Sequence, residues 1–190
     1  MALTPSSPAL PDLLARCLRN DRRGQELLYR QFYGYAMSVC MRYTRSRDEA
    51  LDVVNDGFLK VFTRLDQYDS TQPFKGWLRR IMINTALDLY RASVRHQHED
   101  INEAQAASTD VADAYSQLAH EELIELIQHL SPAYRLVFNL YVIDGYSHDE
   151  IAARLSISVG SSKSNLARAR ENLRTMILKK NSDEYARATR

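Results

Sequence analysis

The chain has 190 residues, a formal net charge of +1, 45% hydrophobic and 26% charged residues, a balance typical of a soluble globular protein of one or two domains. Glycine (6) and proline (5) are scarce, which favours helices over a turn-rich β protein. Cys17 and Cys40 have no CxxC spacing, and His96 and His98 lack a third ligand at a suitable distance, so no metal site is predicted. No phosphate loop or hydrolase motif is present, so neither an enzyme nor a cofactor is predicted. No long apolar run occurs, so no membrane insertion is predicted, and the two cysteines, read as free thiols, together with an N-terminus unlike a signal peptide indicate the cytoplasm.

The near-zero net charge hides three unequal blocks. Residues 1–99 hold 15 Lys and Arg against 11 Asp and Glu, and residues 126–190 hold 10 against six. Between them, residues 100–125 carry seven acids and no base. Two mildly basic blocks around an acidic connector predict two modules and a linker.

The N-terminal block predicts a series of helices. Apolar residues recur at helical spacing over 22–44 and again after Ser46, which is a candidate N-cap like Asp12 and Asp21 earlier. Residues 67–73 read as a loop, and 74–95 as a further helix.

The second of these helices has an acidic face. Such a face repels DNA, so it is either simply solvated or a surface for docking another protein, and composition leaves both interpretations open. The polar side chains are Asp48, Glu49, Asp52, Asn55 and Asp56.

The helix over 74–95 has a mixed polar stripe, and an aromatic loop precedes it. Asp88 and Arg91 at this spacing are explained by a salt bridge alone, and Trp77 is expected in the core. A loop with Tyr68, Gln72 and Phe74 beside a basic helix nevertheless has the composition that holds unstacked single-stranded bases. The stripe consists of Arg80, Asn84, Asp88, Arg91 and Arg95.

The second basic block follows the polar, acidic segment 97–115 and reads as helices from 116 onward. One helix is predicted to begin with Ser131 as its N-cap and Pro132 at its first position, and to end at Gly145. Ser147 and Glu150 have the spacing of a capping box for the next helix, and a short break leads to another helix, which is the pattern of a helix-turn-helix.

The last helix, with Ser158 as its expected N-cap, has one apolar and one basic side. Val159, Ser162, Leu166 and Ala169 fall on the side expected to pack inward. The opposite side is either a solvated basic face or a DNA-binding surface whose side chains donate to phosphates and base edges. The capped helix and the tight turn before it favour the DNA-binding interpretation. Small residues on this side would allow close approach of the backbone. The residues expected at DNA are Ser161, Lys163, Ser164, Ala167, Arg168 and Arg170.

Three strings of this sequence together resemble the ECF (extracytoplasmic function) group of the sigma-70 family of bacterial RNA polymerase sigma factors. The strings are RDEALDVVNDGFLKVF, FKGWLRRIMINTALDLYR and LSPAYRLVFNLYVIDGYSHDEIAARLSISVGSSKSNLARAR, and the resemblance covers about residues 10–95 and 118–178. It implies an all-α fold with two small helical domains, the sigma region 2 bundle and the region 4 helix-turn-helix, joined by a flexible acidic linker. The expected divisions are region 2 at 10–95, the linker at 96–117, region 4 at 118–180 and a C-terminal tail at 181–190.

The resemblance also implies a role for each surface. Segment 48–62 is similar to the helix that docks on the clamp helices of the largest polymerase subunit, with Asp52, Asn55, Asp56 and Phe58 at matching places. The minus-ten element is expected to be melted and read by Tyr68, Gln72, Phe74, Arg80, Asn84, Asp88 and Arg91. The minus-thirty-five element is expected to be read by the helix-turn-helix residues given above.

The implied partners are core RNA polymerase, including the flap of its second-largest subunit, promoter DNA and an anti-sigma factor. Two rival interpretations are a helix-turn-helix transcription regulator with an N-terminal sensor or dimerisation domain, and a helical interaction protein without a DNA role. The chain departs from many relatives at Ser162, where they carry valine, and at Asn165, where they carry a basic residue. Because Ser162 faces inward, either its packing is weaker or its hydroxyl makes a compensating hydrogen bond.

Overall fold

The computed structural model describes residues 9–97 and 120–188, and these residues contain helices and no strand. This confirms the expected all-α class. The N-terminal half holds α1 (Leu10–Leu18), α2 (Arg22–Cys40), α3 (Arg47–Thr63), the 3-10 turn η1 (Leu65–Gln67) and α4 (Phe74–Gln97). The C-terminal half holds α5 (His120–Gln128), α6 (Pro132–Phe138), the π-helix η3 (Asn139–Ile143), α7 (His148–Leu155) and α8 (Val159–Ala188).

Most of the expected helix starts are held by side-chain caps. Asp21 caps α2, Ser46 caps α3, and Ser147 with Glu150 forms a complete capping box on α7. Ser131 occupies the N-cap position of α6, with Pro132 following, but its hydroxyl makes no cap hydrogen bond. Asp12 lies inside the first turn of α1 instead of capping it.

Helices α1–α4 form an N-terminal bundle. Their apolar faces meet in a core that includes Leu28, Phe58, Leu78 and Leu87, each at most 2% exposed. Gly57 lies where α3 crosses α4, and a side chain there would clash with the Met82 sulfur, so this position brings the two helices close together.

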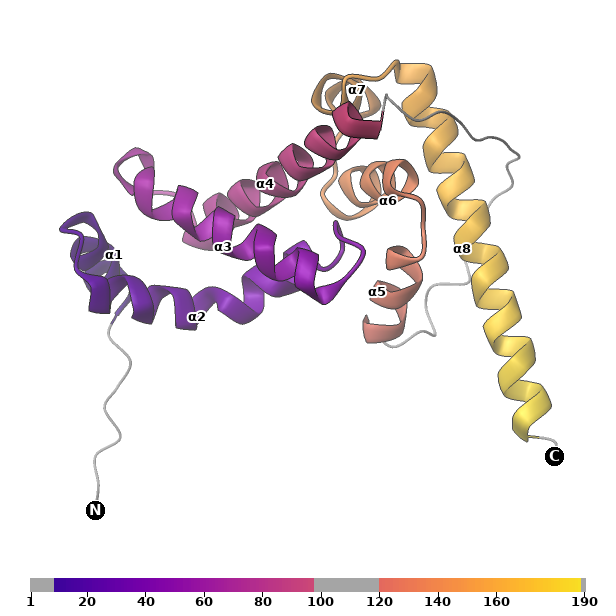
Figure 1. Ribbon diagram of the computed structural model, residues 1–190, viewed down its shortest axis with the longest axis horizontal. Helices are drawn as coiled ribbons and strands as arrows, with labels where there is room; N and C mark the ends of the chain where they lie inside the picture. The colour runs from indigo at the N-terminus through magenta and orange to yellow at the C-terminus, as the bar shows by residue number, and fades with distance from the viewer. Residues whose placement is uncertain (1–8, 98–119, 189–190) are drawn as a thin grey trace.

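Helices α5–α8 form a C-terminal unit in which α6 and α7 pack on the long α8 (Figure 1). The turn between α7 and α8 begins at Ser156, whose left-handed backbone (φ 56°) ends α7. Ser158 then accepts a hydrogen bond from the Ser161 amide at 2.9 Å, as expected of the α8 N-cap. Helix α8 continues to Ala188, so the segment predicted to be a tail is helical up to that residue.

The two units also touch each other directly. Figure 1 shows the C-terminal end of α4 beside α7, and Arg135 of α6 donates to the Thr44 carbonyl of the N-terminal bundle. The predicted acidic linker falls almost wholly on residues 98–119, outside the described part of the chain. Direct packing between the units was not predicted from the sequence.

Candidate nucleic-acid interface

The basic side of α8 is open to solvent at the start of the helix. Ser161, Lys163 and Ser164 are exposed near the start of the helix, and Ala167, Arg168 and Arg170 are partly exposed. Among the described side chains, no carboxylate lies within salt-bridge distance of Lys163, Arg168 or Arg170. This face therefore presents positive charge and hydroxyl groups to solvent directly after the helix-turn-helix turn, a composition that suits DNA phosphates.

The opposite side of α8 is buried, and the Ser162 hydroxyl on that side makes a hydrogen bond. Its side chain is fully buried, and its hydroxyl lies 2.9 Å from Nδ1 of His148. Tyr141 stacks on the His148 ring at 4.5 Å between centroids. Burial, and then the nearby Lys163 charge, lower the pKa of His148, so the neutral ring is favoured in the fold. Of the two alternatives left open for Ser162, the structure therefore shows the compensating hydrogen bond.

The loop before α4 is ordered by its own side chains. Asp69 accepts from both the amide and the hydroxyl of Thr71, at 2.9 and 2.7 Å, and the hydroxyl hydrogen bond is the main cause of the lowered pKa of Asp69. Tyr68 donates to the backbone oxygen of Gln72, whose side chain is exposed. Phe74 is only 3% exposed and packs under the Tyr68 ring, so it supports the loop from the core.

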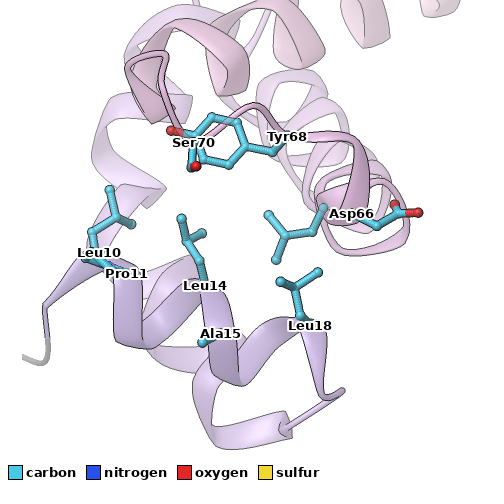
Figure 2. Close-up of a pocket in the computed structure, with 9 residues that line it drawn as sticks. Leu10, Pro11, Leu14, Ala15, Leu18, Asp66, Tyr68 and Ser70 are labelled. Atoms are coloured by element: carbon cyan, nitrogen blue, oxygen red, sulfur yellow. The ribbon is translucent and has the colours of Figure 1, made fainter.

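A groove lies between this loop and α1 (Figure 2). Its volume is about 430 Å³, and leucines of α1 form one wall while Tyr68 and Ser70 lie on the other side. Leu18 at its edge is 54% exposed. The groove is thus an apolar slot that opens beside a half-buried aromatic ring.

The polar stripe on α4 is tied to neighbouring side chains. Asp88 forms ion pairs with Lys60 of α3 at 3.0 Å and with Arg91 at 2.9 Å, so the expected helix salt bridge is present. Arg91 also donates through Nε to the Arg154 carbonyl of α7 at 3.1 Å. The Arg154 side chain reaches Asn84 at 3.4 Å, while Arg80 is exposed. The structure therefore brings α7 against two of the residues predicted for the minus-ten element, Asn84 and Arg91.

The acidic face of α3 is turned to solvent. Asp52, Asn55 and Asp56 are exposed, and Tyr29 donates to the Asn55 side chain at 3.0 Å. Leu51 and Leu59 on the same helix are 36% and 63% exposed. Phe58, which the resemblance placed at the polymerase, is only 2% exposed and contacts the Tyr29 ring, so it packs the helix onto the bundle.

Sequence reasoning missed a set of polar residues between the two units. Arg79 of α4 and Tyr43 after α2 both donate to Asp144, whose side chain is 2% exposed. Arg135 and Asn139 are also buried, at 1% and 0% exposure. Their signal was present in the sequence, because both interrupt an otherwise apolar run over 131–143.

The described residues hold neither a metal site nor a membrane-spanning helix. No group of three His, Cys, Asp or Glu side chains there could hold a metal ion, and both cysteines are free and buried. No described helix is both long and apolar enough to cross a membrane.

Comparison with known proteins matches both units to family models. Residues 28–96 match sigma-70 region 2, and residues 120–173 match sigma-70 region 4. The chain is 29% identical over 171 residues to the ECF RNA polymerase sigma-E factor of Escherichia coli strain K12, covering 84% of this chain and 89% of that protein. It is 28% identical to the RNA polymerase sigma-H factor of Pseudomonas aeruginosa, with the same coverage.

Two solved structures also resemble this chain. One is the structure of CnrH in complex with the cytosolic domain of CnrY, whose matched chain is 25% identical in sequence to this chain. The TM-score is 0.44, and the match covers 87% of this chain and 95% of that one. The sigma factor RpoE in complex with the anti-sigma factor NepR from Bartonella quintana is 22% identical, with a TM-score of 0.48 and coverage of 81% and 96%.

Proposed function

Because this chain belongs to the ECF group of the sigma-70 family of RNA polymerase sigma factors, we propose that it binds core RNA polymerase and directs promoter-specific binding, melting and transcription initiation. It acts in the cytoplasm, where the polymerase carries out the chemistry, and the chain itself supplies binding energy and sequence selection. The single observation that carries this proposal is the occurrence of both sigma regions, in order, on one chain.

We assign duplex reading at the minus-thirty-five element to α8. The exposed side chains at its start, Lys163 and Ser164, suit a groove of DNA because a cation contacts phosphate while a small polar residue approaches base edges. Arg168, one turn further, is held at 3.4 Å from the Tyr134 hydroxyl, which limits its motion before DNA binds. Ser161, Ala167 and Arg170 complete this surface in the proposal.

We assign melting and reading of the minus-ten element to the loop 67–74 and α4. An aromatic ring beside an apolar groove supports capture of an unstacked base, and a groove of about 430 Å³ falls within the size range of small-molecule sites. Captured bases offset the few kcal/mol that unstacking costs, by order of magnitude. Tyr68 and Gln72 contact bases in this proposal, Phe74 supports them, and Arg80, Asn84, Asp88 and Arg91 form the adjoining stripe.

We assign polymerase docking to α3. Exposed carboxylates beside two exposed leucines, Leu51 and Leu59, support a protein interface better than a solvated face, because such surfaces combine apolar anchors with charge. Asp52, Asn55 and Asp56 would meet the clamp helices, and region 4 would meet the flap. An anti-sigma factor is proposed as a third partner on the family resemblance alone.

The experiment that tests the function is run-off transcription with purified core RNA polymerase. Genomic fragments that bind the assembled holoenzyme would serve as templates, with core polymerase alone as the control. The proposal expects transcripts with discrete start sites only when the protein is present. If the protein binds specific duplex sites as a dimer without polymerase and adds no transcript, the rival regulator interpretation holds instead.

A further inference from the structure

The first residue of α7 is a histidine whose ring is held from two sides. Nδ1 of His148 lies 2.9 Å from the Ser162 hydroxyl of α8, and the Tyr141 ring of η3 stacks on the imidazole at 4.5 Å between centroids. The backbone under the ring is fixed by the capping box, in which Glu150 accepts from both the amide and the hydroxyl of Ser147. The ring therefore has a defined position beside the start of α8.

The second ring nitrogen of His148 is open to solvent. Among the described residues, Nε2 has no hydrogen-bond partner, and it is not one of the buried polar atoms that lack a partner. The two nitrogens thus have different surroundings, because Nδ1 is anchored on α8 and Nε2 can bond to a group outside the protein. The bond to Ser162 explains how the ring supports α8, but it leaves Nε2 without a role.

The charges around this ring favour its neutral form in the free protein. Lys163 and Arg170 of α8 act on the ring as cations, and Asp149, the neighbour on α7, acts on it as an anion. The other carboxylate of this turn is engaged in the capping box. Burial, and then the charge of Lys163, lower the pKa of His148. A neutral, titratable ring therefore lies at the edge of the cationic surface that the proposed function assigns to DNA.

Bound DNA changes this balance of charge. In a helix-turn-helix complex the second helix enters the groove, while the first helix crosses the phosphate backbone. With α8 in the groove, the backbone passes α7, the helix that His148 begins. Phosphates bring negative charge to a ring that two cations surround, and an opposite charge nearby raises the pKa of an imidazole.

The contact with α8 suits both protonation states of the ring. A neutral imidazole has one donor and one acceptor nitrogen, whereas both nitrogens donate in the protonated ring. The hydroxyl of Ser162 can donate to Nδ1 of the neutral ring or accept from Nδ1 of the protonated one. Protonation therefore keeps the anchoring hydrogen bond and turns Nε2 into a charged donor directed at solvent or at a ligand.

We propose that His148 is a further DNA-binding residue, which takes up a proton from solvent when duplex DNA binds and then donates from Nε2 to a backbone phosphate. This inference rests on the proposed function for the duplex that α8 reads. Its consequence follows from linkage, because a complex that binds a proton more readily than the free protein is favoured by acid. Duplex affinity therefore rises as the pH falls through the pKa of the bound state, and levels off below the lower pKa of the free protein.

The test titrates the full chain with a labelled duplex that carries the minus-thirty-five element of a promoter found in the run-off assay. Affinity should rise about fivefold from pH 8 to pH 6, which is the range in which a histidine changes its charge. The slope of log affinity against log salt should steepen by up to about 0.9 at the lower pH, because one phosphate contact is added. Calorimetry in buffers of different ionisation enthalpy should show an uptake of about half a proton near pH 6.5.

Three substitutions separate this role from a structural one. His148→Gln removes the charge and should bind with the affinity that the parent protein has at pH 8, at every pH and without proton uptake. His148→Arg carries a permanent charge and should bind with the affinity that the parent has at pH 6, again without uptake. His129→Gln is the matched control, because it changes an exposed histidine of the same unit outside the surface assigned to DNA, and it should keep the full pH dependence.

Three results would overturn the inference. They are duplex binding by the parent protein without proton uptake, a His148→Gln variant that keeps the pH dependence of the parent, and a folded His148→Arg variant that binds less tightly than His148→Gln. The first result needs no substitution, so the test holds even if a variant does not fold. Duplex binding that does not depend on pH contradicts this inference alone, whereas no duplex binding at any pH would also remove the assignment of α8 to DNA.

Discussion

The two surfaces assigned to promoter DNA differ in their state in the free protein. On α8, Lys163 and Arg168 lie on a face that no described carboxylate neutralises. On α4, Asp88 and Arg91 are bound to each other, to Lys60 and to the backbone of α7. The difference shows that a sequence motif reports which side chains suit DNA, whereas only packing shows whether those side chains are available.

The largest effect is expected from changes on α3, the surface assigned to polymerase docking. Charge reversal of Asp52 and Asp56 to lysine should weaken polymerase binding by about 100-fold or more, because like charges across an interface cost several kcal/mol. Affinity measured by titration of labelled core polymerase checks this. Asp12→Lys on α1, an exposed reversal away from α3, should change little.

Unchanged polymerase affinity in the Asp52 and Asp56 variant would remove the docking assignment for α3. Duplex DNA binding should survive the same change, because α8 lies in the other unit. Loss of both activities would mean that the two units do not divide the work as proposed.

A second pair of substitutions tests the DNA-binding surface assigned to α8 alone. Lys163→Ala with Arg168→Ala should lower affinity for minus-thirty-five duplex at least about tenfold and reduce the salt slope of binding by about two, since each phosphate contact contributes about 0.9. Binding measured over a range of salt concentrations checks both values. Polymerase association should stay intact, and its loss instead would contradict the assignment of α8 to DNA.

A smaller effect concerns how α8 is held. Ser162→Ala removes the hydroxyl that pairs with His148 in a buried position, so the free energy of unfolding should fall by about 1 kcal/mol. Ser164→Ala on the exposed side of the same helix is the control and should stay within about 0.5 kcal/mol of the parent protein. Denaturant unfolding followed by circular dichroism checks this, and equal effects would show that the Ser162 contact contributes nothing.

The smallest expected effect is a pH dependence at His148. The pKa of this ring is lower in the folded protein than its ordinary value of 6.5, so the unfolded chain binds the proton more readily. Stability from this group is fully present above about pH 6.5 and is lost as the pH falls through the lower folded pKa. His148→Gln should therefore flatten the loss of stability between pH 7 and pH 5, and an unchanged slope would exclude this role.

Local features of this molecule could be predicted from the sequence, and long-range ones could not. The capping box at Ser147 and the inward side of α8 depend on spacings of three and four residues, which a sequence displays directly. The burial of Phe58 and Phe74 depends on neighbours from other helices, so a family pattern alone does not distinguish a contact residue from its support.

The interface between the units is the clearest failure of sequence reasoning. Asp144 is 65 residues from Arg79 along the chain and 101 from Tyr43, and no periodic pattern connects them. The π-helix that begins at Asn139 also makes side-chain directions harder to predict, because a helical projection assumes a constant 3.6 residues per turn. Arg135 inside an apolar run was the available hint that a polar partner lies elsewhere in the fold.

The measurement that tests the central claim most directly is the distance between labels attached at the exposed positions Gln31 of α2 and Asn172 of α8, in the free protein and in its complex with core RNA polymerase. The difference between the two promoter surfaces predicts one short distance in the free protein, set by the contacts of Asp144 with Arg79 and Tyr43, and a longer one in the complex. The same distance distribution in both states would contradict the claim that packing decides which of the two promoter surfaces is available.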